Sequence, residues 1–111
     1  MRNINNNAEF EQLIAGNKPV LLKFYADWCS DCKAVEPVLS ELSNDYEGQI
    51  DFAKIDVEKH QDIAKKYNIR GIPAVFFLKN GEIKDQARGI QPKAALELKL
   101  KQLLAQQTNH G

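Results

Sequence analysis

The chain has no long apolar run and no excess of charge of either sign, and it contains only two cysteines. No apolar run approaches the roughly 18 residues that a helix needs to span a bilayer. Fifteen basic residues balance fifteen acidic ones, so we expect no nucleic acid and no membrane as a partner. The N-terminus lacks the hydrophobic segment of a secretory signal, and we therefore expect a cytoplasmic location.

What is present is the composition of a globular protein. Hydrophobic residues make up 43% and charged residues 27% of the 111 positions, which allows one core without help from metals or further disulfides. The sequence contains no internal repeat, no low-complexity segment and no linker. We therefore expect a single domain over residues 1–111, acting as a monomer.

Hydrophobic patterns and turn residues predict alternating strands and helices. The run from Val20 to Ala26 is apolar nearly throughout, as in a parallel sheet with both faces covered. Asn80-Gly81 predicts a hairpin, because both turn positions require positive φ. The expected elements are a weak strand at 2–4, a helix capped by Asn6 and Glu9 to about Ala15, strand 20–26, a helix from the cysteines to about Tyr46, strand 50–57, helix 61–67, strands 74–79 and 82–88, and a helix from near Pro92.

This order predicts an α/β fold. Parallel βαβ units followed by an antiparallel hairpin and a terminal helix give a central mixed sheet of four to five strands, flanked by about four helices. Pro37 lies inside the second helix and is expected to kink it. The last helix carries one apolar stripe, which we interpret as core packing: Leu96, Leu100, Leu103 and Leu104.

The two cysteines lie at a strand-to-helix junction, within the segment WCSDCK at residues 28–33. Thiol–disulfide exchange needs one thiolate that attacks and a second thiol that resolves the mixed disulfide. At a helix N-terminus, Cys29 would be favoured as a thiolate by unpaired N–H groups and the helix dipole. Cys32 follows about one turn later and faces inward. We expect Cys29 to be the nucleophile and Cys32 the resolving thiol.

A structural disulfide and a metal site are the two alternative interpretations of this pair. So short a loop would stabilise the fold by only about 2 kcal/mol, which a domain of this size hardly needs. A Cys2His2 zinc site would require both His60 and His110 at unfavourable spacings. We therefore expect no metal, and interpret both histidines as surface residues.

Several segments together resemble the thioredoxin family, and the match covers nearly the whole chain. The carrying segments are residues 24–33 (FYADWCSDCK), Pro37, residues 67–73 (YNIRGIP), residues 77–82 (FLKNGE) and Gly89. Together they are far more specific than the cysteine spacing alone. The resemblance implies a thioredoxin fold and a thiol-disulfide oxidoreductase.

The resemblance also implies a surface for protein substrates. The bond between Ile72 and Pro73 would be cis, and its loop would pack against the cysteines. The backbone of Ile72 would pair with an extended substrate segment. A shallow apolar groove would then be formed by Trp28, Gly71, Ile72, Pro73, Gly89 and Ile90.

The chain departs from the family between its cysteines. Thioredoxins typically carry Gly-Pro there, and this chain carries Ser30 and Asp31. The Asp31 carboxylate should oppose a thiolate at Cys29 by like-charge repulsion, although the helix dipole stabilises the carboxylate itself. We expect these residues to tune the redox potential, with Lys33 shaping the local electrostatic potential.

A second departure lies at Lys23. Thioredoxins place a buried aspartate at this strand position, paired with a lysine that Lys54 matches, and the aspartate accepts the proton of the resolving thiol. Two buried lysines are unfavourable, so one would be neutral or would extend to solvent. Either Lys23 has a lowered pKa and promotes deprotonation of Cys32, as a neutral amine or as a cation, or it points to solvent and water alone transfers the proton.

These observations predict a protein-disulfide reductase. No bound cofactor is expected, since both electrons reside on the sulfurs of the Cys29–Cys32 pair. The family implies disulfide-containing client proteins, and recharging by a flavin-dependent thioredoxin reductase or another upstream reductant. Two alternatives remain open: an oxidant or isomerase for a restricted set of clients, and a non-catalytic binding subunit that uses the same fold.

Overall fold

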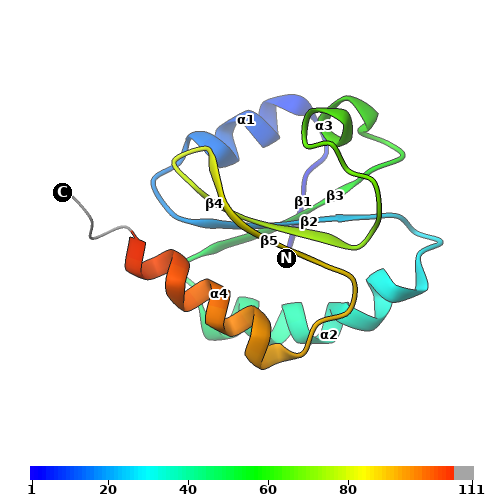
Figure 1. Cartoon of the computed structure of the whole chain (residues 1–111). Coiled ribbons are helices and arrows are strands. Elements are labelled where there is room, and N and C mark those ends of the chain that lie inside the picture. The colour runs from blue at the N-terminus through cyan, green and yellow to red at the C-terminus, as the bar shows by residue number, and fades with distance from the viewer. Residues whose placement is uncertain (107–111) are drawn as a thin grey trace.

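Five strands form one mixed sheet, with helices on both of its faces (Figure 1). The computed structural model describes residues 1–106. The strands are β1 (Arg2–Asn3), β2 (Val20–Tyr25), β3 (Asp51–Asp56), β4 (Ala74–Lys79) and β5 (Glu82–Arg88), and the helices are α1 (Asn7–Ala15), α2 (Ser30–Asp45), α3 (Gln61–Lys66) and α4 (Lys93–Ala105). The predicted fold class is confirmed.

The strand order β1-β3-β2-β4-β5 places β2 at the centre of the sheet. It runs parallel to β3 and antiparallel to β4, with Lys23 opposite Lys54 on one side and Val75 on the other. Helices α1 and α3 cover one face, and α2 and α4 cover the other (Figure 1). Because both faces are covered, a central strand that is apolar nearly throughout is stable here.

Two apolar cores fill the space between the sheet and its helices. Successive side chains of β2 alternate between them, with Leu21 in the core under α2 and α4 and Leu22 in the core under α1 and α3. Lys23 therefore points to the same face as Leu21. In the second core, Tyr67 packs against Phe24 and Phe76, with ring centroids 5.4 and 5.3 Å apart.

The predicted turn and cap signals act as expected. The side chain of Asn6 accepts a hydrogen bond from the backbone N–H of Glu9 at 2.9 Å, while the Glu9 carboxylate accepts from the N–H of Asn5 at 2.8 Å. Asn80 and Gly81 have φ values of 55° and 77°, so the hairpin between β4 and β5 is confirmed. None of the helices among residues 1–106 is both long and apolar enough to cross a membrane.

The differences from the predicted elements lie at their ends. Strand β2 ends at Tyr25, one residue earlier than expected. Pro92 is the N-cap of α4 instead of a first-turn residue, because its ψ of 153° is extended. Helix α2 ends at Asp45, one residue earlier than expected, and contains Pro37 as predicted.

Candidate active site

Cys29 and Cys32 form a disulfide where β2 leads into α2. Cys29 is the N-cap of α2, and its Sγ accepts a hydrogen bond from the backbone N–H of Cys32 at 3.1 Å. Their Cα atoms are 5.3 Å apart. Both side chains are buried, with 5% of Cys29 and 2% of Cys32 exposed. The first sulfur thus sits where backbone N–H groups favour negative charge.

The loop before β4 packs against this disulfide. The Ile72–Pro73 bond is cis, as the family resemblance implied. The half-buried Ile72 packs against the cluster that Ala26 forms with the two cysteines. Gly89 donates its N–H to the carbonyl of Pro73 at 3.0 Å and has a φ of 71°, so the end of β5 is joined to the same loop.

Trp28 stands in solvent beside the cysteines, with 67% of its surface exposed. Its indole N–H donates to the carboxylate of Glu58. A turn after β3 holds Glu58, since the carboxylate of Asp56 accepts from the backbone N–H groups of Glu58 and Lys59 at 2.8 and 3.3 Å. Glu58 was not predicted, and an aspartate ending a strand before polar residues is the turn signal that could have located it.

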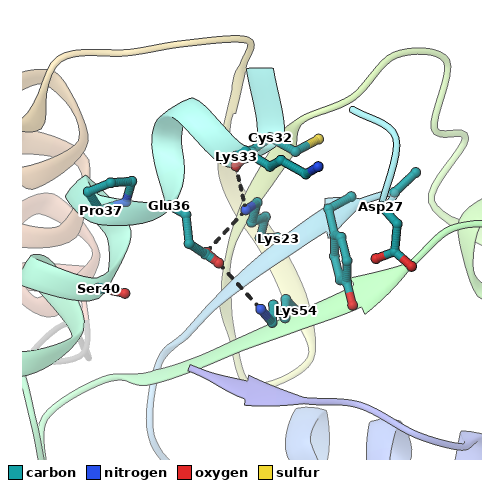
Figure 2. Close-up of a pocket in the computed structure, with 10 residues that line it drawn as sticks. Lys23, Asp27, Cys32, Lys33, Glu36, Pro37, Ser40 and Lys54 are labelled. Atoms are coloured by element: carbon teal, nitrogen blue, oxygen red, sulfur yellow. Dashed lines mark hydrogen bonds and ion pairs between the residues drawn. The ribbon is translucent and has the colours of Figure 1, made fainter. Parts of the chain in front are cut away.

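Lys23 is buried under Cys32, and only 2% of it is exposed. Its Nζ donates to the backbone carbonyl of Cys32 at 2.9 Å and to a Glu36 carboxylate oxygen at 3.1 Å (Figure 2). The other Glu36 oxygen lies 3.4 Å from Nζ of Lys54. The alternative in which Lys23 points to solvent is therefore wrong.

Glu36 is an anionic partner of both lysines that was not predicted. One carboxylate lies between both ammonium groups (Figure 2), so neither lysine is without an anionic partner. The sequence carries a signal for this arrangement, since residues four apart on a helix share a face. Glu36 is four residues after the inward-facing Cys32 and therefore lies on the same face of α2.

Burial and ion pairing shift the pKa values of Lys23 and Glu36 in opposite directions. Burial lowers the pKa of Lys23, and the charge and hydrogen bond of Glu36 raise it, without restoring its ordinary value. Burial alone would raise the pKa of Glu36, but Lys23 and Lys54 outweigh it and hold this pKa below its usual range. The cluster is thus an ion pair with an additional cation.

The cluster borders a cavity of about 540 Å³, which Cys32 also lines. The Tyr25 ring lies beside both lysines, with its centroid 5.7 Å from Nζ of Lys23 and 5.3 Å from Nζ of Lys54. With 32% of its side chain exposed, Glu36 reaches the solvent side of this cavity. Solvent can therefore approach the Glu36 side of the ion pair, whereas Lys23 is nearly inaccessible.

The remaining predicted residues lie around this centre, and Lys33 lines the cavity beside Cys32. Ser30, Asp31 and Lys33 are exposed in the first turn of α2. Within residues 1–106, no three histidine, cysteine or acidic side chains are placed to hold a metal ion. His60 is half-buried instead of fully at the surface and is the N-cap of α3, and His110 lies outside the described residues.

Comparisons with known proteins agree with this geometry. The family model described as Thioredoxin matches residues 2–102. Thioredoxin C-2 of Corynebacterium nephridii is 50% identical over 78 residues, which are 70% of this chain and 72% of that protein. The thioredoxin of Mycoplasmoides gallisepticum is 40% identical over 101 residues, which are 91% of this chain and 100% of that protein.

A solved structure of Malassezia sympodialis thioredoxin has a TM-score of 0.86 and 32% sequence identity, covering 93% of this chain and 90% of that one. A disulfide at the start of α2, packed against the loop before β4, thus occurs in a chain that matches these proteins in sequence and in fold. The chain belongs to the thioredoxin family, and it is an oxidoreductase that catalyses thiol–disulfide exchange.

Proposed function

We propose that this protein reduces disulfides in client proteins, with Cys29 as the attacking and Cys32 as the resolving thiol. The observation that carries the proposal is the position of Cys29 as the N-cap of α2, where its sulfur accepts the N–H of Cys32 at 3.1 Å. The same contact stabilises a thiolate once the pair is reduced. Cys32 lies inside the first turn of α2 and is not its N-cap.

The reaction has two exchange steps. The Cys29 thiolate attacks one sulfur of the client disulfide, the client S–S bond breaks, and the first client sulfur leaves as a thiolate that takes up a proton. Cys32 then loses its proton and attacks the Cys29 sulfur of the mixed disulfide. The second client sulfur leaves and is protonated, so the client gains two electrons and two protons while the Cys29–Cys32 disulfide forms.

Clients would dock on the surface that surrounds the cysteines. Trp28 and Ile90 are exposed apolar side chains, and Ile72 packs against the cluster that contains both cysteines. Pro73 and Gly89 are joined by a backbone hydrogen bond, and Gly71 is exposed at the start of the same loop. An extended client segment would pair with the backbone of Ile72, which fixes the client disulfide near Cys29.

Lys23 and Lys54 would supply positive charge to the resolving step. Lys23 donates to the carbonyl of Cys32, so a cation there would favour the thiolate form of this residue. Exposed Ser30, Asp31 and Lys33 would tune the potential of the pair through their charges and through the stiffness of the turn.

The oxidised pair would be recharged by a flavin-dependent thioredoxin reductase or another upstream reductant. A reductant of this kind needs a reducing compartment, so we propose a cytoplasmic location. Fractionation of the source cells, with detection of the protein in each fraction, tests the location. Recovery outside the cytoplasm would contradict it.

The function is tested by insulin disulfide reduction with thioredoxin reductase and NADPH. We expect turnover by the wild type and none by Cys29→Ser. The matched variant Cys32→Ser keeps the attacking thiol and should accumulate a mixed disulfide with insulin. Partner capture without any turnover by the wild type would instead favour a binding subunit.

The potential of the pair separates a reductant from an oxidant. A value near that of typical thioredoxins, about −270 mV, supports reduction, whereas a value near −120 mV would make the protein an oxidant. Equilibration with glutathione buffers, followed by separation of the oxidised and reduced forms, measures this potential.

A further inference from the structure

The ion-paired cluster under Cys32 joins three elements. Glu36 comes from α2, Lys23 from β2 and Lys54 from β3 (Figure 2). The carboxylate is closer to Lys23, at 3.1 Å, than to Lys54, at 3.4 Å. Lys23 in turn donates to the backbone carbonyl of Cys32. Lys23, the most buried of the three residues, thus contacts both the carboxylate and the resolving cysteine.

We propose that Glu36 is a positioning residue for the resolving step: it holds Lys23 as an ammonium group against Cys32, so that a fixed positive charge favours the Cys32 thiolate. This inference deepens the proposed function and rests on it, since it assumes that Cys32 must ionise to attack the mixed disulfide. Glu36 does not contact the reacting sulfurs in this arrangement and acts through Lys23.

The burial of Lys23 explains why a carboxylate is required. Only 3% of its side chain is exposed, against 32% for Glu36 and 27% for Lys54. An ammonium group removed from water loses hydration, and without an anion it is favoured in its neutral form. Among the described residues, Glu36 is the only carboxylate within 4.0 Å of this nitrogen.

The charges around the cavity also support a net positive potential at Cys32. Two ammonium groups and one carboxylate leave one uncompensated positive charge in the cluster. The titratable side chains that line the cavity besides Cys32, on β2, the following loop, α2 and β3, are Lys23, Tyr25, Asp27, Lys33, Glu36 and Lys54. Asp27 and Lys33 carry opposite charges and are exposed to water, which weakens their effect.

The test uses Glu36→Gln, which keeps the size and hydrogen-bonding capacity of the side chain and removes its charge. In full-length protein carrying Cys29→Ser, Cys32 is the only thiol, and its pKa is measured by ultraviolet absorbance. The pKa of Lys23 is measured by NMR of its Cε and Nζ. We expect Glu36→Gln to lower the pKa of Lys23. The Cys32 pKa should rise by about one unit, a tenfold change in the ionisation constant.

Two further variants separate action through Lys23 from a direct effect of the Glu36 charge. In a Lys23→Met background, removing the Glu36 carboxylate only removes a negative charge near Cys32, so Glu36→Gln should lower or leave the Cys32 pKa. Lys54→Met removes a neighbouring cation and should raise the pKa of Lys23. The proposal is overturned if Glu36→Gln lowers the Cys32 pKa in both backgrounds, or leaves the pKa of Lys23 unchanged.

These measurements do not depend on turnover. Insulin reduction by the wild type tests the proposed reductase function, whereas the two pKa values test the role of Glu36. A wild type that fails to reduce insulin but shows the expected pKa shifts would contradict the function and retain the electrostatic coupling. Normal turnover with unshifted pKa values would contradict the coupling alone.

Discussion

At the scale of single residues, the unusual feature is a lysine at the centre of the sheet. Lys23 is nearly inaccessible to water, and an unpaired charge at such a position would be strongly unfavourable. The chain offsets this with a carboxylate from the neighbouring helix and a backbone carbonyl. Such a buried pair is expected to contribute little net stability, because desolvation opposes the attraction. We therefore infer that the pair of Lys23 and Glu36 serves the chemistry of Cys32 and not the stability of the fold.

The lowered pKa of Glu36 predicts a specific loss of stability in acid. The unfolded chain protonates this group near its ordinary pKa of 4.5, and the folded protein only at lower pH. The stabilisation is therefore present above pH 4.5 and is lost as the pH falls through the folded value. Urea unfolding at a series of pH values should show a smaller acid loss in Glu36→Gln than in the wild type. Parallel pH profiles of the two proteins would contradict this.

The lowered pKa of Lys23 predicts a change of stability on the alkaline side of the pH profile. Its pKa is lowered in the folded protein, so between that value and 10.5 the unfolded chain binds more protons. Stability should therefore rise with pH across this window. Lys23→Met should remove the rise, and urea midpoints measured from neutral to alkaline pH check it. Lys99→Met, which alters a half-exposed lysine paired with Asp85, is the control and should keep the rise.

At the scale of elements, side-chain contacts fix how helices begin and how they meet. Asn6 and Glu9 satisfy backbone N–H groups at the start of α1. Tyr46, at the C-terminal cap of α2, donates its hydroxyl to the carboxylate of Glu97 in α4 at 2.8 Å. Lys93 adds ion pairs from α4 to Glu41 and Asp45. The contact between α2 and α4 is therefore partly polar, above a core of leucines.

Asn6→Ala should remove the cap of α1. The backbone N–H of Glu9 would lose its acceptor, and such substitutions typically cost about 1 kcal/mol. Chemical denaturation followed by circular dichroism measures the loss. Asn6→Asp keeps an acceptor oxygen at this position and should retain most of the stability; an equal loss in both variants would point to another cause.

Tyr46→Phe should lower stability by about 1.5 kcal/mol, since it removes a hydrogen bond to a charged group. Burial and the Glu97 carboxylate raise the pKa of Tyr46 to about 12. The folded protein thus keeps a proton that the unfolded chain loses near pH 10, and the wild type should lose stability as the pH rises between these values. Unfolding by urea at increasing alkaline pH should show a weaker loss in Tyr46→Phe. Glu97→Gln keeps an acceptor and should fall between the two.

At the scale of the whole molecule, both edges of the sheet are protected against pairing with another chain. Strand β1 has only two residues, and β5 carries charged and mostly exposed side chains, including Glu82, Lys84 and Arg88. Short or charged edges disfavour strand addition. Both faces of the sheet are covered by helices (Figure 1). The radius of gyration of 13.1 Å matches the roughly 13 Å expected for one compact domain of this length.

We therefore predict a monomer that unfolds in one cooperative step. Size-exclusion chromatography with light scattering should give a mass near 12.6 kDa. Circular dichroism and Trp28 fluorescence should report coincident urea transitions, because the two cores share one sheet. A mass near twice this value, or transitions that separate, would contradict the prediction.

The order of the elements, the hairpin at Asn80-Gly81 and the cysteine pair could be predicted from the sequence. These features depend on local patterns: apolar periodicity, residues that adopt positive φ, and a thiol spacing of three positions at a helix start. The ends of elements were less predictable, since the backbone ψ of Pro92 decides whether it caps α4 or begins it. The cis Ile72–Pro73 bond followed from family resemblance, because cis remains a minority form before proline.

The environment of the cysteines depends on contacts between elements that are distant in the sequence. Glu36 is 13 positions from Lys23 and 18 from Lys54, and the packing of α2 on β2 and β3 brings the three charges together. The contact between Trp28 and Glu58 spans 30 positions in the same way. Whether a buried lysine is paired depends on which side chains a neighbouring element presents. That is a property of packing between elements, and no pattern along a single strand contains it.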